Sequence, residues 1–180
     1  VLMLAELEQI SDLQVTQNTA IARYTAARLG GPADILAIAS TQQALTGAVG
    51  WAHQQQISWR ILGGGANVLV SDDGIEGLVI INKSNAVAFD EETGIVIADS
   101  GISLISLARR CMSRGLQGLE WGVSVPGTLG GAVVNNAGAH GADMNSNLQD
   151  AKIFDVTTNM VETWTREQMD YDYRHSALKG

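Results

Sequence analysis

Three consecutive glycines after an apolar run form the first candidate for ligand chemistry. They lie within Leu62-Gly-Gly-Gly-Ala-Asn-Val-Leu-Val-Ser-Asp72. Because glycine has no side chain, the backbone N–H groups of Gly63, Gly64 and Gly65 could converge on one anion, such as a phosphate. Asn67 could hold the loop by bonding its own backbone. A tight turn that needs positive φ is the alternative, but an asparagine and three glycines between two apolar runs favour a phosphate site.

The spacing of these glycines limits the kind of phosphate site. It lacks the Gly-Lys-Ser/Thr of a Walker loop, and it does not match the Rossmann fingerprint. The sequence therefore argues against nucleotide hydrolysis at a P-loop and against a Rossmann dinucleotide site.

A second glycine-rich segment spans residues 118–141. Pro126-Gly127 marks a turn, and residues 127–136 could form a helix whose N-terminal amides face a ligand. Gly130-Gly131-Ala132 has almost no side chains, so a flat ring could lie against this backbone. Close packing of the helix against a neighbour is the alternative, although it does not explain such glycine density alone. Two segments of this kind indicate a ligand long enough to touch both, and a dinucleotide fits.

The composition limits the other classes of function. The formal net charge of −8 argues against docking on nucleic acid or anionic lipid. Hydrophobic residues make up 46% of the 180 residues, and no apolar run approaches the roughly 20 residues of a membrane helix. The single cysteine, Cys111, excludes an internal disulfide framework and a multi-thiolate zinc site, and we expect no metal. A cytoplasmic protein without membrane insertion is the simplest interpretation.

The residue pattern predicts a first lobe over residues 1–81. Apolar residues recur at helical spacing within residues 1–15, which predicts an N-terminal helix before a polar stretch. A second helix is expected from a cap at Ser40 or Thr41 to about Gln55. Short apolar runs predict four strands, over residues 34–39, 59–62, 68–70 and 78–81.

Residues 82–180 are predicted to form a second lobe. Hairpins are expected over residues 86–98 and 151–164, and a helical turn follows the second hairpin. Between them, Ser103 is expected to cap a helix that ends at Gly115. Strands and helices do not alternate as in a doubly wound sheet, so the predicted fold class is α+β in two lobes.

Three residues with reactive side chains are expected to be structural. Cys111 lies on the apolar face of the predicted helix, which indicates a core position. Glu120 precedes a buried turn and is interpreted as a hydrogen-bond acceptor rather than a general acid. His140 is expected to belong to the loop that contains it.

Six ordered motifs make the sequence similar to one bacterial enzyme family. From about Asn18 to Lys179 the chain resembles the UDP-N-acetylenolpyruvoylglucosamine reductases, known as MurB. The resemblance implies a two-lobed FAD-binding domain of the vanillyl-alcohol-oxidase (PCMH) type, with FAD between the lobes. The motifs are Gly30-Gly31-Pro32-Ala33, Gly63-Gly-Gly-Ala-Asn-Val-Leu-Val-Ser-Asp72, Gly118-Leu-Glu120, Val125-Pro-Gly-Thr-Leu-Gly-Gly-Ala132, Asn136-Ala-Gly-Ala139 and Tyr173-Arg-His-Ser176.

The resemblance also implies which residues bind FAD. Those expected at the pyrophosphate region are Gly63, Gly64, Gly65, Ala66, Asn67 and Val68. Those expected to line the flavin and phosphates are Pro126, Gly127, Thr128, Gly130, Gly131 and Ala132. Ala66 replaces a serine that is more usual in the family, and the lost hydrogen bond costs about 0.5–1.5 kcal/mol.

The last motif supplies the candidate catalytic residue. In this family the arginine of the motif sits at the substrate, which makes Arg174 the expected catalytic and substrate-binding group. A fixed guanidinium could bind the carboxylate of an enolpyruvyl group bidentately and stabilise the negative charge that hydride delivery builds beside it. Tyr173 is expected to position Arg174 at the substrate, and Ser176 to support the loop rather than donate a proton.

The implied activity is the reduction of UDP-N-acetylglucosamine enolpyruvate to UDP-N-acetylmuramate in peptidoglycan precursor synthesis. NADPH would reduce the FAD. Members of the family are longer, and the resemblance implies a C-terminal substrate-binding domain, absent from this chain, that supplies a serine proton donor and a glutamate. We therefore expect the chain to hold FAD but to turn over poorly by itself. The alternatives are a catalytically silent FAD-binding module, an alcohol or sugar oxidase of the same flavin fold, and a scaffold without flavin.

Overall fold

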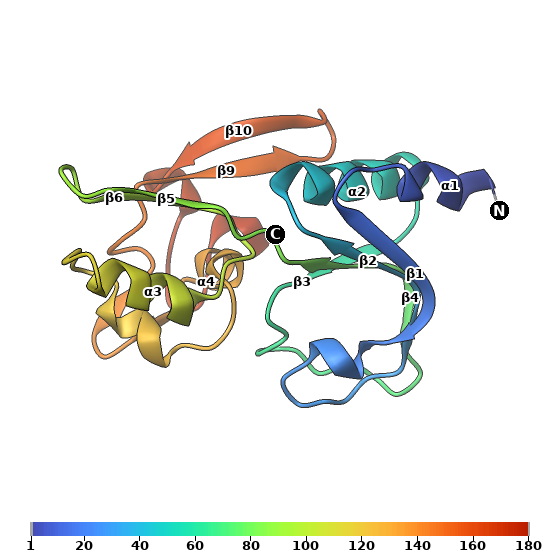
Figure 1. The fold of residues 1–180 in the computed structure, drawn as a ribbon, viewed down its shortest axis with the longest axis horizontal. Helices are drawn as coiled ribbons and strands as arrows, with labels where there is room; N and C mark the ends of the chain where they lie inside the picture. Colours follow the sequence, from blue (N-terminus) through green and yellow to red (C-terminus); the bar gives the residue numbers. More distant parts are fainter. Residues whose placement is uncertain (1, 180) are drawn as a thin grey trace. The chain divides into compact units, whose positions relative to one another are not determined.

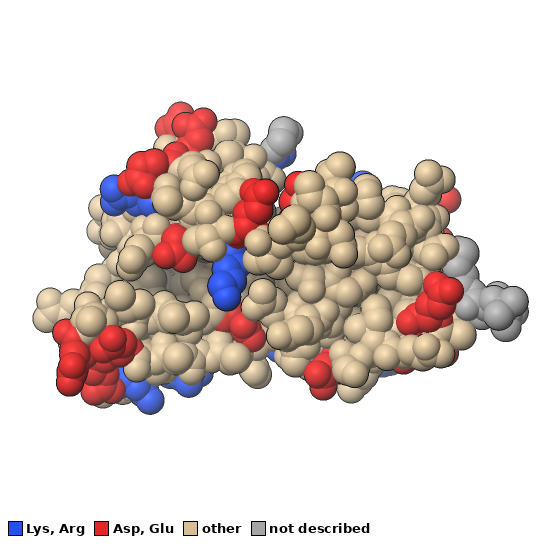
Figure 2. Space-filling view, turned by 90° about the horizontal axis from the view of Figure 1, so that it is seen from above, with Lys and Arg blue, Asp and Glu red and all other residues tan. Residues whose placement is uncertain are grey.

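The computed structural model describes residues 2–179, which divide into two compact units, residues 1–85 and residues 86–180 (Figure 1). Each unit has a hydrophobic core of its own. No helix within residues 2–179 is long and apolar enough to cross a lipid bilayer. On the face seen in Figure 2, acidic side chains lie in small scattered groups, in keeping with the net charge of −8.

A four-stranded sheet is the frame of the first unit (Figure 1). In the spatial order β1-β2-β4-β3, β1 is antiparallel to β2, whereas β2, β4 and β3 run parallel to one another. Residues 78–82 of β4 are all buried, as expected of an inner parallel strand. The bounds are β1 Leu13–Ala20, β2 Pro32–Ala39, β3 Trp59–Leu62 and β4 Ile75–Asn82.

Helix α2 (Gln42–Gln54) packs on this sheet (Figure 1). Thr41 caps it as predicted, because its Oγ1 accepts a hydrogen bond from the Ala44 amide at 3.1 Å. The short helix α1 (Leu2–Glu8) precedes β1, and the 3-10 turn η1 (Ile21–Tyr24) follows it. One core cluster of the unit is made by Ile21, Ala33, Leu36, Leu62, Val70, Val79 and Ile81.

Two of the sequence predictions are wrong in this unit. β1 occupies residues that the pattern assigned to the end of a helix and to a polar stretch. β1 is the outer strand beside β2, so most of its side chains stay partly or fully exposed and their sequence lacks an apolar signal. Residues 68–70 form no strand, and Leu69 is 80% exposed. The segment lies in the loop between β3 and β4 and pairs with neither outer strand of the sheet.

The second unit contains three two-stranded antiparallel sheets, β5–β6, β7–β8 and β9–β10, and the helices α3 and α4 (Figure 1). One core lies around α4 and includes Trp121, Met144 and Met169, while a smaller one lies under the first hairpin. The strands are β5 Val87–Asp90, β6 Ile95–Ala98, β7 Gly138–Ala139, β8 Ala142–Asp143, β9 Asp150–Asp155 and β10 Met160–Thr165. The helices are α3 Leu104–Met112 and α4 Leu129–Asn135, with 3-10 turns η2 Glu120–Ser124, η3 Glu167–Met169 and η4 Ala177–Lys179.

Both predicted hairpins and the cap of α3 are confirmed in this unit. The Ser103 hydroxyl accepts a hydrogen bond from the Ser106 amide at 3.4 Å. Helix α3 ends at Met112, three residues earlier than predicted, and Gly115 takes a left-handed φ of 73° in the turn that follows. Cys111 is buried, and Glu120 Oε2 accepts a hydrogen bond from the Gly118 amide at 2.8 Å, so both are structural as expected.

Candidate functional site

The glycine loop after β3 leaves its backbone donors unused. From Gly63 to Val70, no amide donates a hydrogen bond to any group within residues 2–179. The loop is held instead by a bond in which the Ala26 amide donates to the Gly65 carbonyl at 2.9 Å. Asn67 does not hold it, because its exposed side chain bonds to nothing within the same residues. This loop therefore presents a continuous run of backbone donors without protein partners, the arrangement that suits an anion.

The fold itself requires a glycine at position 65 of this loop. Gly65 has a φ of 62°, and a Cβ there would lie 2.0 Å from the Tyr24 carbonyl oxygen. Gly64 is exposed, and its φ lies outside the left-handed region. The turn alternative, which depends on positive φ, thus explains Gly65 but not Gly64.

The start of α4 differs from what the sequence predicts. The amide of Leu129 donates to Ile102 O at 2.9 Å, and that of Gly130 donates to Ser100 O at 2.7 Å. The Gly131 amide donates to Oγ1 of Thr128, the N-cap, at 3.4 Å. For Leu129, Gly130 and Gly131 the expectation that the N-terminal amides face a ligand is therefore wrong, because the chain itself accepts their hydrogen bonds.

The two glycines at the start of α4 differ in whether the packing leaves room for a side chain. A Cβ on Gly130 would lie 2.9 Å from Ser100 Cβ and 3.0 Å from its carbonyl oxygen, so the packing excludes a side chain. A Cβ on Gly131 would meet only Thr128 Oγ1, at 3.5 Å, which is ordinary contact. Gly131 is exposed, so its lack of a side chain leaves open surface rather than a tight fit.

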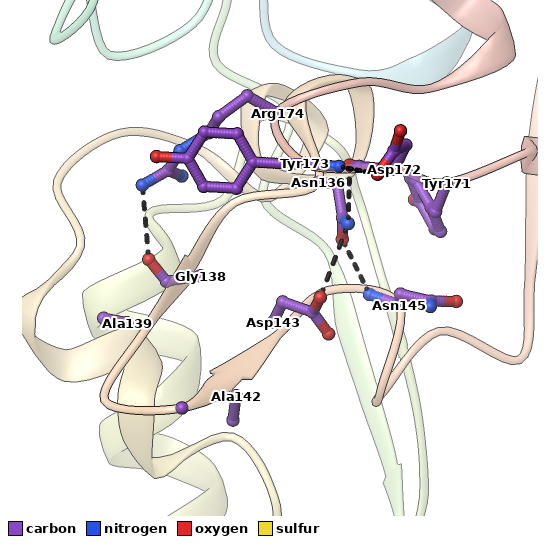
Figure 3. Close-up of a pocket in the computed structure, with 11 residues that line it drawn as sticks. Asn136, Gly138, Ala139, Ala142, Asp143, Asn145, Tyr171, Asp172, Tyr173 and Arg174 are labelled. Atoms are coloured by element: carbon purple, nitrogen blue, oxygen red, sulfur yellow. Dashed lines mark hydrogen bonds between the residues drawn. The ribbon is translucent and has the colours of Figure 1, made fainter.

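A cavity of about 470 Å³ lies in the second unit, and Tyr173 and Arg174 line it (Figure 3). Both belong to the turn formed by residues 172–175, the Arg174 turn, in which the Asp172 and His175 backbones bond to each other at 3.1 and 3.3 Å. Arg174 has a φ of 56° and donates from Nη2 to the Gly138 carbonyl at 3.5 Å. The remaining lining residues are Asn136, Gly138, Ala139, Gly141, Ala142, Asp143, Asn145, Tyr171 and Asp172.

Residues 33–163 of the chain match the protein family described as FAD binding domain. The chain belongs to this FAD-binding domain family. The predicted fold class, α+β of the vanillyl-alcohol-oxidase type, is confirmed with it.

Relatives of this FAD-binding domain include UDP-N-acetylenolpyruvoylglucosamine reductases, as the motifs predict. That of Synechococcus sp. (strain RCC307) is 40% identical over 175 residues, which are 97% of this chain and 57% of the relative. The chain thus spans a little over half the length of this relative. The crystal structure of the Thermus caldophilus enzyme (MurB) has a TM-score of 0.72 at 27% identity, covering 91% of this chain and 56% of that one.

A more distant structure shares the fold of this FAD-binding domain alone. A variant of Phl p 4, a glucose dehydrogenase, has a TM-score of 0.65 at 14% identity over 93% of this chain and 38% of that one.

The sequence analysis of this FAD-binding domain missed the polar residues around Arg174. Asn136 is buried, and its side-chain amide contacts both the segment at residues 143–145 and the Arg174 turn (Figure 3). Burial raises the pKa of the Tyr171 phenol to about 12, and the Asp143 carboxylate adds to the rise. The Tyr171 hydroxyl has no hydrogen-bond partner within residues 2–179 and remains a neutral donor at neutral pH. The only sequence signal was the asparagine directly after a helix, a position that favours left-handed backbone.

The Ser176 hydroxyl and the His140 imidazole of this domain each have a hydrogen-bond partner within the chain. Ser176 is fully buried and donates from Oγ to the Val134 carbonyl at 2.6 Å, which confirms that it supports the loop. His140 is exposed and lies 3.2 Å from the Ser124 hydroxyl through Nε2.

Proposed function

We propose that this domain binds FAD and that the loop from Gly63 to Val68 holds the pyrophosphate. The unused amides of this loop support the proposal, because backbone donors without protein partners suit a diphosphate. The net charge of −8 does not attract an anion, so local donors of this kind are needed. The exposed Gly64 supports it as well, since its φ is not one that demands a glycine. Gly65 and Ala66 shape the loop, and Asn67 adds a side-chain amide to the same surface.

The segment from Pro126 to Ala132 is proposed to line the flavin by shape rather than by helix amides. Gly131 supports this role, because it keeps a small open surface that the packing does not require. The amides of Gly127 and Thr128 donate to no group within residues 2–179 and remain available to a ligand. Gly130 and Ala132 then fix the helix behind that surface.

We further propose that the domain serves the reduction of UDP-N-acetylglucosamine enolpyruvate to UDP-N-acetylmuramate, with NADPH as reductant, in the cytoplasm. The observation that carries this proposal is the 40% identity over 97% of the chain to a protein with that reductase name. The substrate is a UDP-sugar, and the reaction belongs to peptidoglycan precursor synthesis.

Arg174 provides the electrostatic part of this reaction. Bound FAD supplies the hydride chemistry. The guanidinium has one long hydrogen bond, to Gly138, and its other N–H groups make none within residues 2–179, so a carboxylate can accept two of them. In that position it stabilises negative charge on the carbon beside the carboxylate. The Tyr173 ring, with its centroid 5.7 Å from the Arg174 Cζ, limits the directions open to the guanidinium.

The test separates cofactor binding from reaction. The purified 180-residue chain is expected to be yellow and to show the absorption of bound flavin. For the reaction, the chain is fused to the part of the Synechococcus reductase that it does not cover, and reoxidation of reduced flavin by substrate is followed in single turnovers. Arg174→Ala should keep the flavin and slow reoxidation by about 10²–10³-fold.

Arg109→Ala is the matched control, because this exposed arginine of the same unit does not line the cavity. A chain without bound flavin would contradict the cofactor proposal. Flavin that substrate never reoxidises in the fusion would indicate a silent binding module, and oxygen uptake driven by an alcohol or sugar would indicate an oxidase. Equal reoxidation by the wild type and Arg174→Ala would remove Arg174 from the mechanism.

A further inference from the structure

The Arg174 turn is attached at both ends to the last turn of α4. On its N-terminal side, Asn136 Nδ2 donates to the Asp172 carbonyl at 3.1 Å (Figure 3). On its C-terminal side, Ser176 Oγ donates to the Val134 carbonyl at 2.6 Å. Both Asn136 and Ser176 are buried, so water does not easily replace these bonds.

Asn136 does more than bond to the turn. Its Oδ1 accepts from the Asn145 amide at 2.9 Å, and its Nδ2 also lies 3.4 Å from Asp143 Oδ2. Asn136 is the C-cap of α4 with a φ of 42°, a conformation that asparagine tolerates better than most residues. One side chain thus joins the helix end, the segment at residues 143–145 and the Arg174 turn.

The Arg174 turn needs such an attachment. Arg174 has a left-handed φ of 56°, which is strained for a long side chain, and Tyr173 beside it is 86% exposed. Neither residue packs its side chain into the core, so burial of the two cavity-lining side chains does not hold the turn in place. The strain persists only where surrounding contacts over-determine the backbone.

We propose that Asn136 is a positioning residue, which fixes the backbone of the Arg174 turn to the C-terminal end of α4 and so sets where the guanidinium lies. The helix then links this arginine to the Pro126–Ala132 segment at its other end. The proposal rests on the proposed function for the role of Arg174, whereas the attachment itself is tested without it.

Limited trypsin digestion measures the attachment directly, because the bond after Arg174 is a trypsin site. Asn136→Gly removes the side chain while keeping the left-handed backbone free of strain. In the 180-residue chain, cleavage after Arg174 should accelerate about tenfold, since local opening sets the rate, while cleavage after Arg28 stays unchanged. Asn159→Gly is the matched control, because Asn159 is also left-handed, with a φ of 57°, but lies in the β9–β10 turn.

Asn136→Asp is the second variant. It keeps the acceptor for the Asn145 amide, loses the donor to Asp172 and places a carboxylate beside Asp143, so it should accelerate the same cleavage. Unchanged cleavage after Arg174 in both variants would overturn the proposal. So would a general loss of fold in both, since Asn136 would then support the whole unit rather than the turn.

In the reductase fusion, Asn136→Gly should retain flavin and lower kcat by about tenfold with a smaller change in KM. A fusion whose wild type does not turn over would refute the proposed reaction but leave the digestion result standing. Turnover of the fusion therefore tests the proposed reaction, and trypsin digestion separately tests the attachment by Asn136.

Discussion

The two glycine-rich segments of this molecule resemble each other in sequence and differ in hydrogen bonding. The loop from Gly63 to Val70 has no amide bonded within residues 2–179, whereas the first amides of α4 are bonded to Ser100, Ile102 and Thr128. One segment therefore offers donors, and the other offers mainly a smooth surface.

The comparison also separates two reasons for a glycine. Gly65 and Gly130 are required by the fold, because neighbouring atoms occupy the place of a Cβ. Gly131 is not required in this way, and Gly64 is exposed and has no positive φ. On the proposed function, glycines of the second kind mark the surface where FAD, rather than the chain, excludes a side chain.

The largest expected effect is on stability, at Gly65. In Gly65→Ala, the new Cβ meets the Tyr24 carbonyl and the residue must keep a positive φ, so the free energy of unfolding should fall by about 3 kcal/mol or more. Thermal or urea unfolding measures this change. Ala66→Gly, at the exposed next position, is the control and should change little. An undiminished melting temperature in Gly65→Ala would show that the fold does not require a glycine at this position.

The next effect is on cofactor affinity, at Gly64. In Gly64→Val, the branched side chain covers the loop amides, so FAD affinity should fall about 100-fold, which is roughly 2.7 kcal/mol, with little loss of fold stability. Fluorescence titration of the flavin-free chain with FAD measures it. If Gly64→Val binds FAD like the wild type, the loop amides do not hold the pyrophosphate.

The smallest effect distinguishes the neighbours Gly130 and Gly131. Gly131→Ala should stabilise the chain by about 0.5–1 kcal/mol, because alanine is the better helix former and its Cβ has room. The same change should lower the affinity for FAD several-fold, because the new methyl group occupies part of the open surface at residue 131. Gly130→Ala should instead destabilise, because Ser100 is in the way. Melting temperatures that shift in the same direction for both variants would contradict this account.

Local chemistry made part of the structure predictable from sequence. Thr41 and Ser103 cap their helices through hydrogen bonds that span three residues, so the pattern near each residue is sufficient. The hairpins at β5–β6 and β9–β10 are predictable for the same reason. β1 was missed because its partner, β2, lies beyond a turn and supplies the pairing that its own polar sequence does not suggest.

The sequence indicated the parts of the candidate site that depend on a local run of residues. It did not indicate the parts that depend on contacts between distant segments. The unused amides follow from a glycine run, but the reason for Gly65 lies at Tyr24, far back along the chain. The partners of the Leu129 and Gly130 amides lie before α3, which hides them from any local pattern. Asn136 was recognised as part of a motif, while its contacts to Asn145 and Asp172 depend on tertiary structure.

The buried thiol of Cys111 has a practical consequence. It is the single cysteine of the chain and lies in the second unit, and burial raises its pKa, which lowers the thiolate fraction at neutral pH. An alkylating reagent can then reach it only when that unit opens. The rate of labelling therefore reports the opening of the second unit alone. It does not respond to unfolding of the four-stranded sheet in the first unit.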